Sequence, residues 1–468
     1  MCTSANDIRL GEIFNQNHMG TMSRSCTSGG CAPEVVVEFR PNKSAYGTFG
    51  FDWLRVEDAE LDNSKSDVKY TKNIGDHYKK KSIKDGKEIF EDLCTKDADI
   101  TSGSAFFKAN SLNTYPSVFY HLTPLNSQKI PALHSTFKYR VPVITLMPND
   151  LACNVDNVNL EAIIDINVYV GEIKPKSLKI ECVKVGANGE PTKVAFDISN
   201  KLTINLTNVP LTKKSKLIIK SVGTLEEDVM LIVKANDLFV CGAVKILRNN
   251  AVRDVEVIYV GTTTNFKNKA KPEKFSPPSV DLNSLRSRLG QALINIKKVH
   301  LLDKNNKPMY VDCTNRITKA SVKYKGMNYE TISLNDLDTS FQDRYKEDFS
   351  KQPIRETKNN KKEIWSFDEN LFRCYFFKNS AVTPYYGVPA AGAGAMGDAH
   401  SMFFDGKGSV GTLSHELGHN LDVAHTFDPE NNAYCFERAS TDNIMDYSSD
   451  KIIFYYEQWK KMNPKGIK

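Results

Sequence analysis

Three histidines near the end of the chain constrain the fold more than any other feature of the sequence. His415, Glu416 and His419 form the pattern H-E-x-x-H, and His425 follows six residues after the second histidine. On a helix, residues four apart lie on the same face, so the imidazoles of His415 and His419 can reach one ion. Three neutral imidazoles and one open position are the usual ligand set of a catalytic zinc. The pattern predicts such a site, with Glu416 beside it as a general base.

The segment that carries the motif is predicted to be an amphipathic helix. At about 100° per residue, four apolar side chains fall on one face. They are Val410, Leu413, Leu417 and Leu421. His415 and His419 fall almost opposite, on the face expected to line a cleft, and Ser409 can cap the N-terminus of the helix.

The chain must turn sharply after this helix if His425 is to join the other two histidines. Glycine commonly makes such a turn, because it takes a left-handed backbone conformation without strain. In this chain the position is Asp422. Aspartate is one of the few other residues that adopt this conformation. We therefore expect Asp422 to have a positive φ, at a modest cost in free energy.

A methionine follows the histidines in the run D-N-I-M-D-Y-S, at residues 442–448. Together the two motifs resemble the metzincin family of zinc metallopeptidases, whose long histidine motif is followed by a methionine turn. The resemblance covers at most residues 280–468 and is strong over residues 409–448. Its main departure from the family pattern is Asp422, where the family has glycine.

The resemblance implies a role for each residue of the two motifs. The implied zinc ligands are His415, His419 and His425. Glu416 is implied as the general base, and Met445 as the turn residue beneath the metal. Tyr447 matches a tyrosine that astacin-like and serralysin-like members place near the zinc, as an extra ligand or as a group that stabilises the oxyanion. The expected activity is that of a zinc-dependent endopeptidase.

The sequence divides into four parts by composition. Residues 1–33 are polar and are interpreted as a flexible arm. Residues 34–260 contain many short β-prone runs, which are typical of one or two antiparallel sandwich-like domains. Residues 261–279 have the composition of a linker. Residues 280–468 mix helix and strand patterns, so the expected fold class is a multidomain protein with a β-rich region before an α/β (α+β) metzincin-like catalytic domain.

The stretch just before the motif helix is expected to bind substrate. Residues 387–397 are rich in glycine and alanine, and residues 400–404 have strand-like character. In metzincins an edge strand in this position pairs with extended substrate. We hypothesise that residues 400–404 are that strand. The segment Gly397–His400 is also similar to a matrixin segment that binds a structural zinc. Further ligands are not evident, so a surface or loop histidine is the alternative interpretation of His400.

Cysteine usage favours buried thiols over a disulfide framework. Most of the ten cysteines are isolated within apolar segments. Cys26 and Cys31 are the one close pair. A disulfide, a small metal clip and an unstructured arm all remain open for this pair.

Charge and hydropathy narrow the classes of partner. The net charge of +6 comes from scattered lysines, which does not indicate nucleic-acid binding. No run approaches the ~18 apolar residues that cross a membrane. The start of the chain lacks the apolar core of a signal peptide, so the expected location is the cytoplasm or a compartment reached by a specialised export route. The expected partners are a protein or peptide substrate and a docking partner for the β-rich region.

Two other functions remain open from the sequence. The first is a binding or structural protein whose metzincin-like fold is catalytically inactive and which acts through its β-sandwich region. The second is an exported effector or toxin, suggested by a peptidase motif in a chain without a signal peptide.

Overall fold

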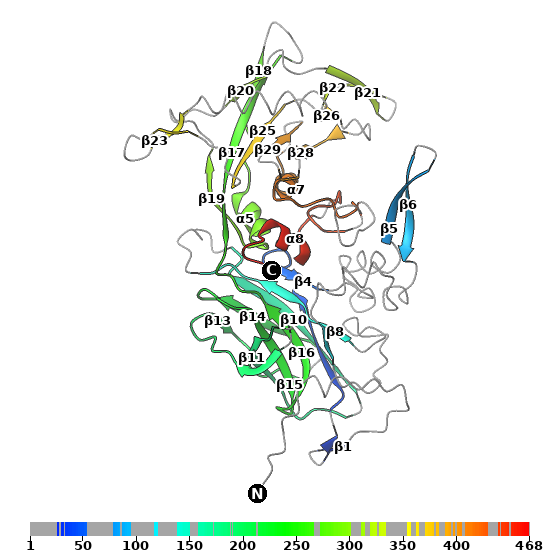
Figure 1. Cartoon of the computed structure of the whole chain (residues 1–468), viewed down its shortest axis with the longest axis vertical. Coiled ribbons are helices and arrows are strands. Elements are labelled where there is room, and N and C mark those ends of the chain that lie inside the picture. Colours follow the sequence, from blue (N-terminus) through cyan, green and yellow to red (C-terminus); the bar gives the residue numbers. More distant parts are fainter. Residues whose placement is uncertain are drawn as a thin grey trace. The chain divides into compact units, whose positions relative to one another are not determined.

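The structure is a computed structural model of the whole chain (Figure 1). It describes most of residues 33–53, 141–149, 158–265, 272–300, 370–378, 391–428 and 441–467, and short strands outside these ranges. The described residues contain far more β-strand than helix, so the β-rich fold expected from the sequence is confirmed. The chain forms two compact units. The first is Met1–Ala251, Thr426–Glu457 and Ile467, and the second is Val252–His425, Gln458–Gly466 and Lys468.

The first unit contains two large β-sheets. The four-stranded sheet has the order β13-β14-β10-β3 and is antiparallel throughout. Its strands are β3 (Val35–Pro41), β10 (Glu161–Val170), β13 (Leu202–Ile204) and β14 (Lys214–Ser221). The six-stranded sheet has the order β12-β11-β15-β16-β9-β4, and only β9 and β16 pair in parallel. Its strands are β4 (Gly50–Asp52), β9 (Val143–Thr145), β11 (Leu178–Val185), β12 (Pro191–Ala195), β15 (Val229–Ala235) and β16 (Phe239–Ile246).

A single hydrophobic core joins the inner faces of these two sheets. Along β10, buried side chains alternate with more exposed ones, as a strand with one face on a core requires. Val37 of β3 and Ile164 of β10 belong to the same core as Leu231 of β15 and Ile246 of β16. β16 approaches β3 closely at Gly242, because a Cβ atom there would lie 2.5 Å from the carbonyl oxygen of Val37.

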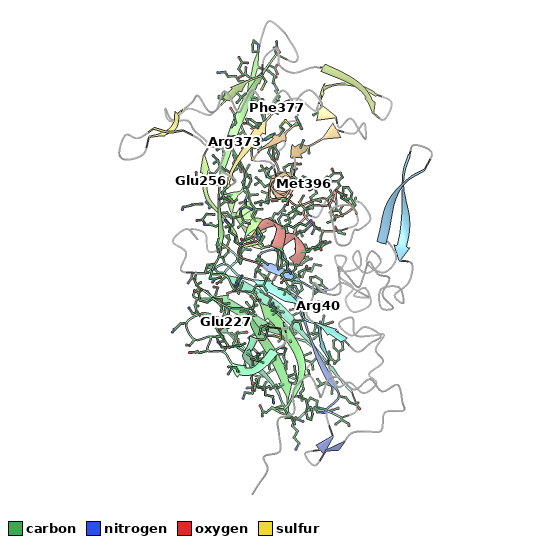
Figure 2. All side chains as sticks on the ribbon, viewed as in Figure 1. Arg40, Glu227, Glu256, Arg373, Phe377 and Met396 are labelled. Carbon is green, nitrogen blue, oxygen red and sulfur yellow. The ribbon has the colours of Figure 1, made fainter. Side chains whose placement is uncertain are left out.

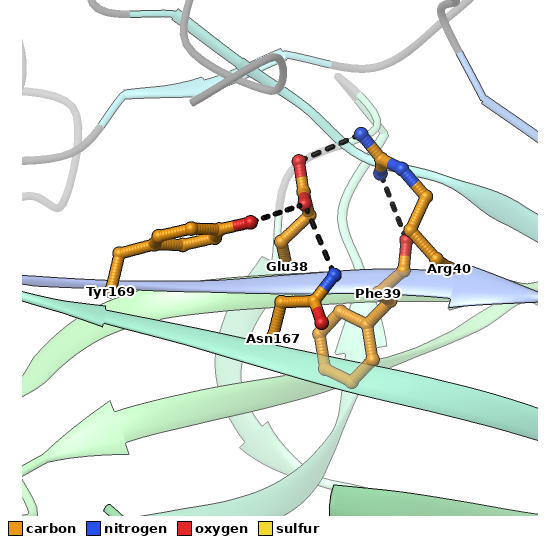
Figure 3. Close-up of polar contacts among 5 residues, drawn as sticks. All are labelled: Glu38, Phe39, Arg40, Asn167 and Tyr169. Atoms are coloured by element: carbon orange, nitrogen blue, oxygen red, sulfur yellow. Dashed lines mark hydrogen bonds and ion pairs between the residues drawn. The ribbon is translucent and has the colours of Figure 1, made fainter. Parts of the chain in front are cut away.

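A buried polar network lies on the outer side of β3 and β10 (Figure 3). The carboxylate of Glu38 is fully buried and accepts a 2.7 Å hydrogen bond from Nη2 of Arg40. The hydroxyl of Tyr169 donates to its second oxygen at 3.3 Å, and Nδ2 of Asn167 lies 3.5 Å from the same oxygen. These partners compensate the cost of burying the charge.

The second unit is built on a mixed sheet. The main order is β18-β17-β25-β29-β28, and β19 and β20 also pair with β17. The strands are β17 (Arg253–Thr264), β18 (Glu273–Phe275), β19 (Ile294–His300), β20 (Tyr310–Asp312), β25 (Leu371–Phe376), β28 (Gly392–Gly394) and β29 (His400–Phe403). β19, β20 and β25 run parallel to β17, and β29 runs parallel to β25. The two antiparallel strands, β18 and β28, lie at the ends of the main order.

Aromatic side chains pack on this sheet around the ends of β25 and β29. Phe376 stacks on Phe403 with ring centroids 5.0 Å apart. Phe377, labelled in Figure 2, stacks on Phe404 at 5.5 Å. These pairs fix β29 against β25 immediately before the chain enters the motif helix.

Three helices lie among the described residues: α5 (Leu282–Gly290), α7 (Val410–Asn420) and α8 (Tyr456–Met462). Asp281 caps α5, since its side chain accepts hydrogen bonds from the backbone N–H groups of Asn283 and Ser284. None of these helices is long and apolar enough to cross a membrane.

The remaining short strands form five small sheets, four of which have two strands. They are β1 (Cys26–Thr27) with β2 (Gly30–Cys31), β5 (Tyr78–Lys84) with β6 (Lys87–Cys94), β7 (Ser117–Phe119) with β8 (Lys138–Arg140), and β23 (Pro353–Glu356) with β24 (Lys362–Ile364). A fifth sheet has the order β21-β22-β26-β27, with strands Lys319–Tyr324, Met327–Ser333, Ala381–Val382 and Pro389–Ala390. Cys26 is the backbone partner of Cys31. Most of the arm expected at residues 1–33 lies outside the described residues.

The boundary between the units differs from the one expected at residues 261–279. The second unit begins at Val252, and this range holds the end of β17 and all of β18. β17 carries a continuous buried run at residues 257–262, which means that both of its faces are covered. By composition alone such a strand resembles those of the preceding sandwich.

Candidate metal centre

The helix that carries the histidines forms as the sequence predicts. α7 begins after Ser409, whose Oγ accepts a hydrogen bond from the backbone N–H of Thr412 at 3.1 Å. Leu413, Leu417 and Leu421 are buried on its apolar side. The cap and the apolar stripe therefore set the start of the helix and the direction of its opposite face.

The helix ends in the left-handed turn predicted at Asp422, whose φ is +67°. The backbone N–H of Val423 donates to the carbonyl of Gly418 at 3.0 Å, and that of Asp422 donates to the carbonyl of His419 at 2.9 Å. These two bonds are those of a Schellman motif, which satisfies the last carbonyls of the helix. The turn reverses the chain within a few residues and so brings His425 back beside the helix.

The three predicted ligands lie together, all within the second unit. One potential ligand atom from each of His415, His419 and His425 lies within 4.8 Å of the other two. Nε2 of His419 lies 3.1 Å from Nε2 of His425. A tetrahedral zinc with Zn–N bonds of about 2.0–2.1 Å separates its nitrogen ligands by about 3.3 Å. The spacing of this pair therefore fits a shared zinc ion.

A backbone hydrogen bond orients the central histidine. Nδ1 of His419 donates to the carbonyl oxygen of Val423 at 2.8 Å. In a neutral imidazole this leaves the lone pair on Nε2, the atom that faces His425. A ligating histidine typically donates its other ring N–H to a carbonyl or carboxylate in this way. The donor chemistry of the site thus fits a divalent metal.

Two buried polar side chains attach α7 to the sheet. Nδ2 of Asn420 donates to the carbonyl of His400 at 2.9 Å. Oγ of Ser401 donates to Oδ1 of Asn420 at 2.7 Å. Because Asn420 follows His419 directly, these bonds fix the ligand-bearing end of the helix against β29. The sequence analysis did not identify them; a polar residue in the buried part of an apolar helix was the available signal.

The proposed general base lies between the helix and the sheet. Glu416 is only 5% exposed, and its carboxylate lies against the backbone of Gly392 and Gly394 in β28. Burial, together with the charge of Glu416, raises the pKa of the Cys374 thiol in β25. A buried carboxylate beside an ordered ligand set can accept and return a proton.

The edge strand of the sheet is not the segment proposed from the sequence. Residues 400–403 form β29, which pairs with β25 on one side and β28 on the other. The end of the sheet, among the residues that the structure describes, is β28 (Gly392–Gly394). The proposal that residues 400–404 form the edge is therefore wrong. β28, which is part of the preceding glycine-rich run, pairs with β29 and takes the end position.

The methionine turn is a tightly bonded loop in the first unit. Asp446 is buried, and its carboxylate accepts hydrogen bonds from the backbone of Ala439, Thr441 and Tyr447 at 2.7, 2.8 and 2.6 Å. Met445 is fully buried, and its backbone N–H donates to Oδ1 of Asn443 at 2.8 Å. This network gives the loop one defined conformation.

Tyr447 is the most exposed residue of that loop. Its side chain is 41% exposed, and its ring contacts Phe427 with centroids 5.0 Å apart. Nζ of Lys451 lies 5.6 Å from the ring centroid. Met445 and Tyr447 belong to the first unit and the histidines to the second, so their predicted roles toward the metal stay predictions.

His400 does not belong to the candidate ligand group found among the described residues. The ligand group formed by His415, His419 and His425 is the only one of three or more found in that part of the chain. Asp398, its neighbour in the matrixin-like segment, lies outside the described residues. The second zinc stays a hypothesis.

Four cysteines have the buried or partly buried thiols that the sequence predicts. Cys241, Cys313 and Cys374 are buried, Cys182 is partly buried, and none of the four forms a disulfide. Burial raises the pKa of Cys182 to about 12. Thiols buried in apolar surroundings are typically unreactive.

Comparison of the chain with protein-family models, with curated proteins and with solved structures gives no match. The geometry of the site and the resemblance of its two motifs are therefore what point to a function.

Proposed function

We propose that the chain is a zinc-dependent endopeptidase with its active site on α7. The observation that carries the proposal is the meeting of His415, His419 and His425, with their potential ligand atoms within 4.8 Å of one another. His419 is set for ligation by its bond to Val423. A chance cluster of surface histidines would not have two buried members and an oriented ring.

Each residue of the site has a separate role in peptide hydrolysis. His415, His419 and His425 would hold the zinc. When bound, zinc supplies Lewis acidity, which activates water and polarises the scissile carbonyl. Glu416 takes a proton from the attacking water and returns it to the leaving amine. The metzincin resemblance implies a further role for Tyr447, the donation of a hydrogen bond to the oxyanion.

The sheet supports an extended substrate beside Glu416. β28 is antiparallel to β29, and its other edge has no strand among the described residues. A peptide in extended conformation can pair with such an edge through backbone hydrogen bonds. The Glu416 side chain lies against β28, so a peptide bound there has its backbone near the general base.

The first test is a chelation experiment on the full chain. The wild-type protein should contain one zinc per chain and digest casein, lose activity with a chelator and regain it with added zinc. Glu416→Gln should keep the zinc and lose cleavage, because it removes the base without touching a ligand. His419→Ala should lose the zinc. A Glu416→Gln protein that digests casein as fast as wild type would contradict the mechanism.

The same experiment separates the rival function. A wild-type protein that binds one zinc but never cleaves peptide is a metal-stabilised binding protein. A protein that binds no zinc is neither a zinc peptidase nor a metal-stabilised binding protein.

A further inference from the structure

Two glycines of the edge strand lie against the general base. A Cβ atom added at Gly392 would lie 2.5 Å from Oε1 and 2.8 Å from Cγ of Glu416. One added at Gly394 would lie 2.9 Å from Oγ of Ser401, 3.1 Å from the backbone oxygen of Glu416 and 3.2 Å from its Oε2. Residues two apart in a strand share a face, so both glycines turn this face toward α7. The carboxylate therefore occupies the space that two strand side chains would otherwise fill.

Backbone conformation does not explain these glycines. The described glycines with positive φ are Gly47, Gly189 and Gly397. Gly392 and Gly394 are not among them, so alanine could adopt their backbone conformation. What the positions require is the absence of a side chain.

The surroundings of Glu416 direct any added bulk onto its carboxylate. Glu416 is 5% exposed, so it has little solvent space to enter. The helix that carries it is bonded to β29 through Asn420, and β28 is paired to the same strand. Both α7 and β28 are thus held by β29. The side chain of Glu416 lies between them and can rotate about its own bonds, so it is the group that would move.

We infer that Gly392 and Gly394 are positioning residues, which hold the carboxylate of Glu416 in its working place by lacking side chains. The consequence for catalysis rests on the proposed peptidase function; the packing relation does not. A general base must lie within about 2.6–3.2 Å of the proton that it takes. A displacement of about 1 Å can cost a factor of about 100 in rate.

The kinetic test compares two glycine-to-alanine substitutions in the full chain. Gly392→Ala should lower kcat by about 100-fold. It should leave the zinc dissociation constant, measured by chelator competition, within about twofold, and KM should change far less than kcat. Gly411→Ala on α7 is the matched control, because its Cβ would make only ordinary contacts, the nearest being Nη1 of Arg288 at 3.4 Å. It should match wild type. A Gly392→Ala protein with wild-type kcat would overturn the inference.

A stability cycle tests the contact without any activity. Gly392→Ala should lower Tm in the wild-type background. In a Glu416→Ala background, which empties the space, the same substitution should leave Tm unchanged or raise it. An equal fall in Tm in both backgrounds would overturn the inference, even if the wild-type protein cleaves peptide. If the coupling is present and the wild type cleaves no peptide, the packing relation stands and the peptidase proposal fails.

Discussion

Nδ1 of His419 lies 2.8 Å from the carbonyl oxygen of Val423, so the turn that ends α7 also orients one of the three histidines of the candidate metal site. The turn exists because Asp422 takes φ +67°, which lets Val423 bond back to Gly418. A local backbone feature thereby sets the direction of a side-chain lone pair. The same turn therefore ends the helix and orients a histidine of the candidate metal site.

Replacing Asp422 with glycine should stabilise the protein. Glycine adopts the left-handed conformation without strain, which removes a cost of about 1 kcal/mol. Zinc affinity should stay within about twofold, because the bond between His419 and Val423 is kept. Asp422→Val is the contrasting variant, since a β-branched residue is strained there. Denaturant unfolding and chelator competition measure both effects. An Asp422→Val protein as stable as wild type would contradict the role of the turn.

Removing the amide of Asn420 should loosen α7 from the sheet. Asn420→Ala leaves the carbonyl of His400 and the hydroxyl of Ser401 without these partners, which costs about 1–3 kcal/mol in the free energy of unfolding. Ser401→Ala removes only one of the two bonds and should cost less. Urea titrations of the three proteins give the comparison. Equal stability of Asn420→Ala and wild type would show that these bonds do not hold the helix.

The N-cap of α5 should make a pH-dependent contribution to stability. The hydroxyl and the backbone N–H of Ser284, with a smaller contribution from Asn283, lower the pKa of Asp281 below its usual 3.8. A carboxyl with a lowered pKa stabilises the fold above its unfolded pKa and loses this effect as the pH falls through the folded pKa. The Tm gap between wild type and Asp281→Ala should therefore be constant from pH 7 to about 5 and shrink below about 4.

The control for this titration is Asp281→Asn. An asparagine accepts the same backbone hydrogen bonds but does not titrate in this range. The Tm gap between Asp281→Asn and Asp281→Ala should not change with pH. A Tm gap between wild type and Asp281→Ala that widens as the pH falls would contradict this prediction.

A fragment of residues 280–468 should not fold, although its sequence resembles a complete catalytic domain. It lacks β17, with which β19, β20 and β25 all pair. Val257, Ile258 and Val260 are fully buried in this strand. Burial of each contributes about 1.5–3 kcal/mol, so these three together approach the 5–15 kcal/mol that stabilises a typical domain. Circular dichroism and zinc binding test the fragment. A cooperative, zinc-binding fragment would show that β17 is dispensable.

The parts of this fold that depend on nearby residues could be predicted from the sequence. The cap at Ser409, the apolar stripe of α7 and the positive φ of Asp422 follow from residue type and spacing over a few turns of chain. The convergence of His419 and His425 follows from the same turn. These features need no knowledge of which distant strands pair.

Features set by long-range pairing could not be predicted. Residues 400–403 have the pattern of a strand whether they lie inside a sheet or at its edge, and only the pairing with β28 decides. The buried run of β17 fits a sandwich strand as well as a strand of a mixed sheet. The contact of Gly392 with Glu416 joins two segments across the sheet, and a glycine-rich run in a sequence does not say which side chain fills the space beside it.

Diffraction from crystals of the full chain at wavelengths on either side of the zinc absorption edge tests the central claim most directly. The account predicts one strong anomalous peak, present only above the edge, about 2.0–2.1 Å from a ring nitrogen of each of His415, His419 and His425. A zinc-saturated crystal with no peak there, or with a peak that leaves His425 unligated, would contradict it.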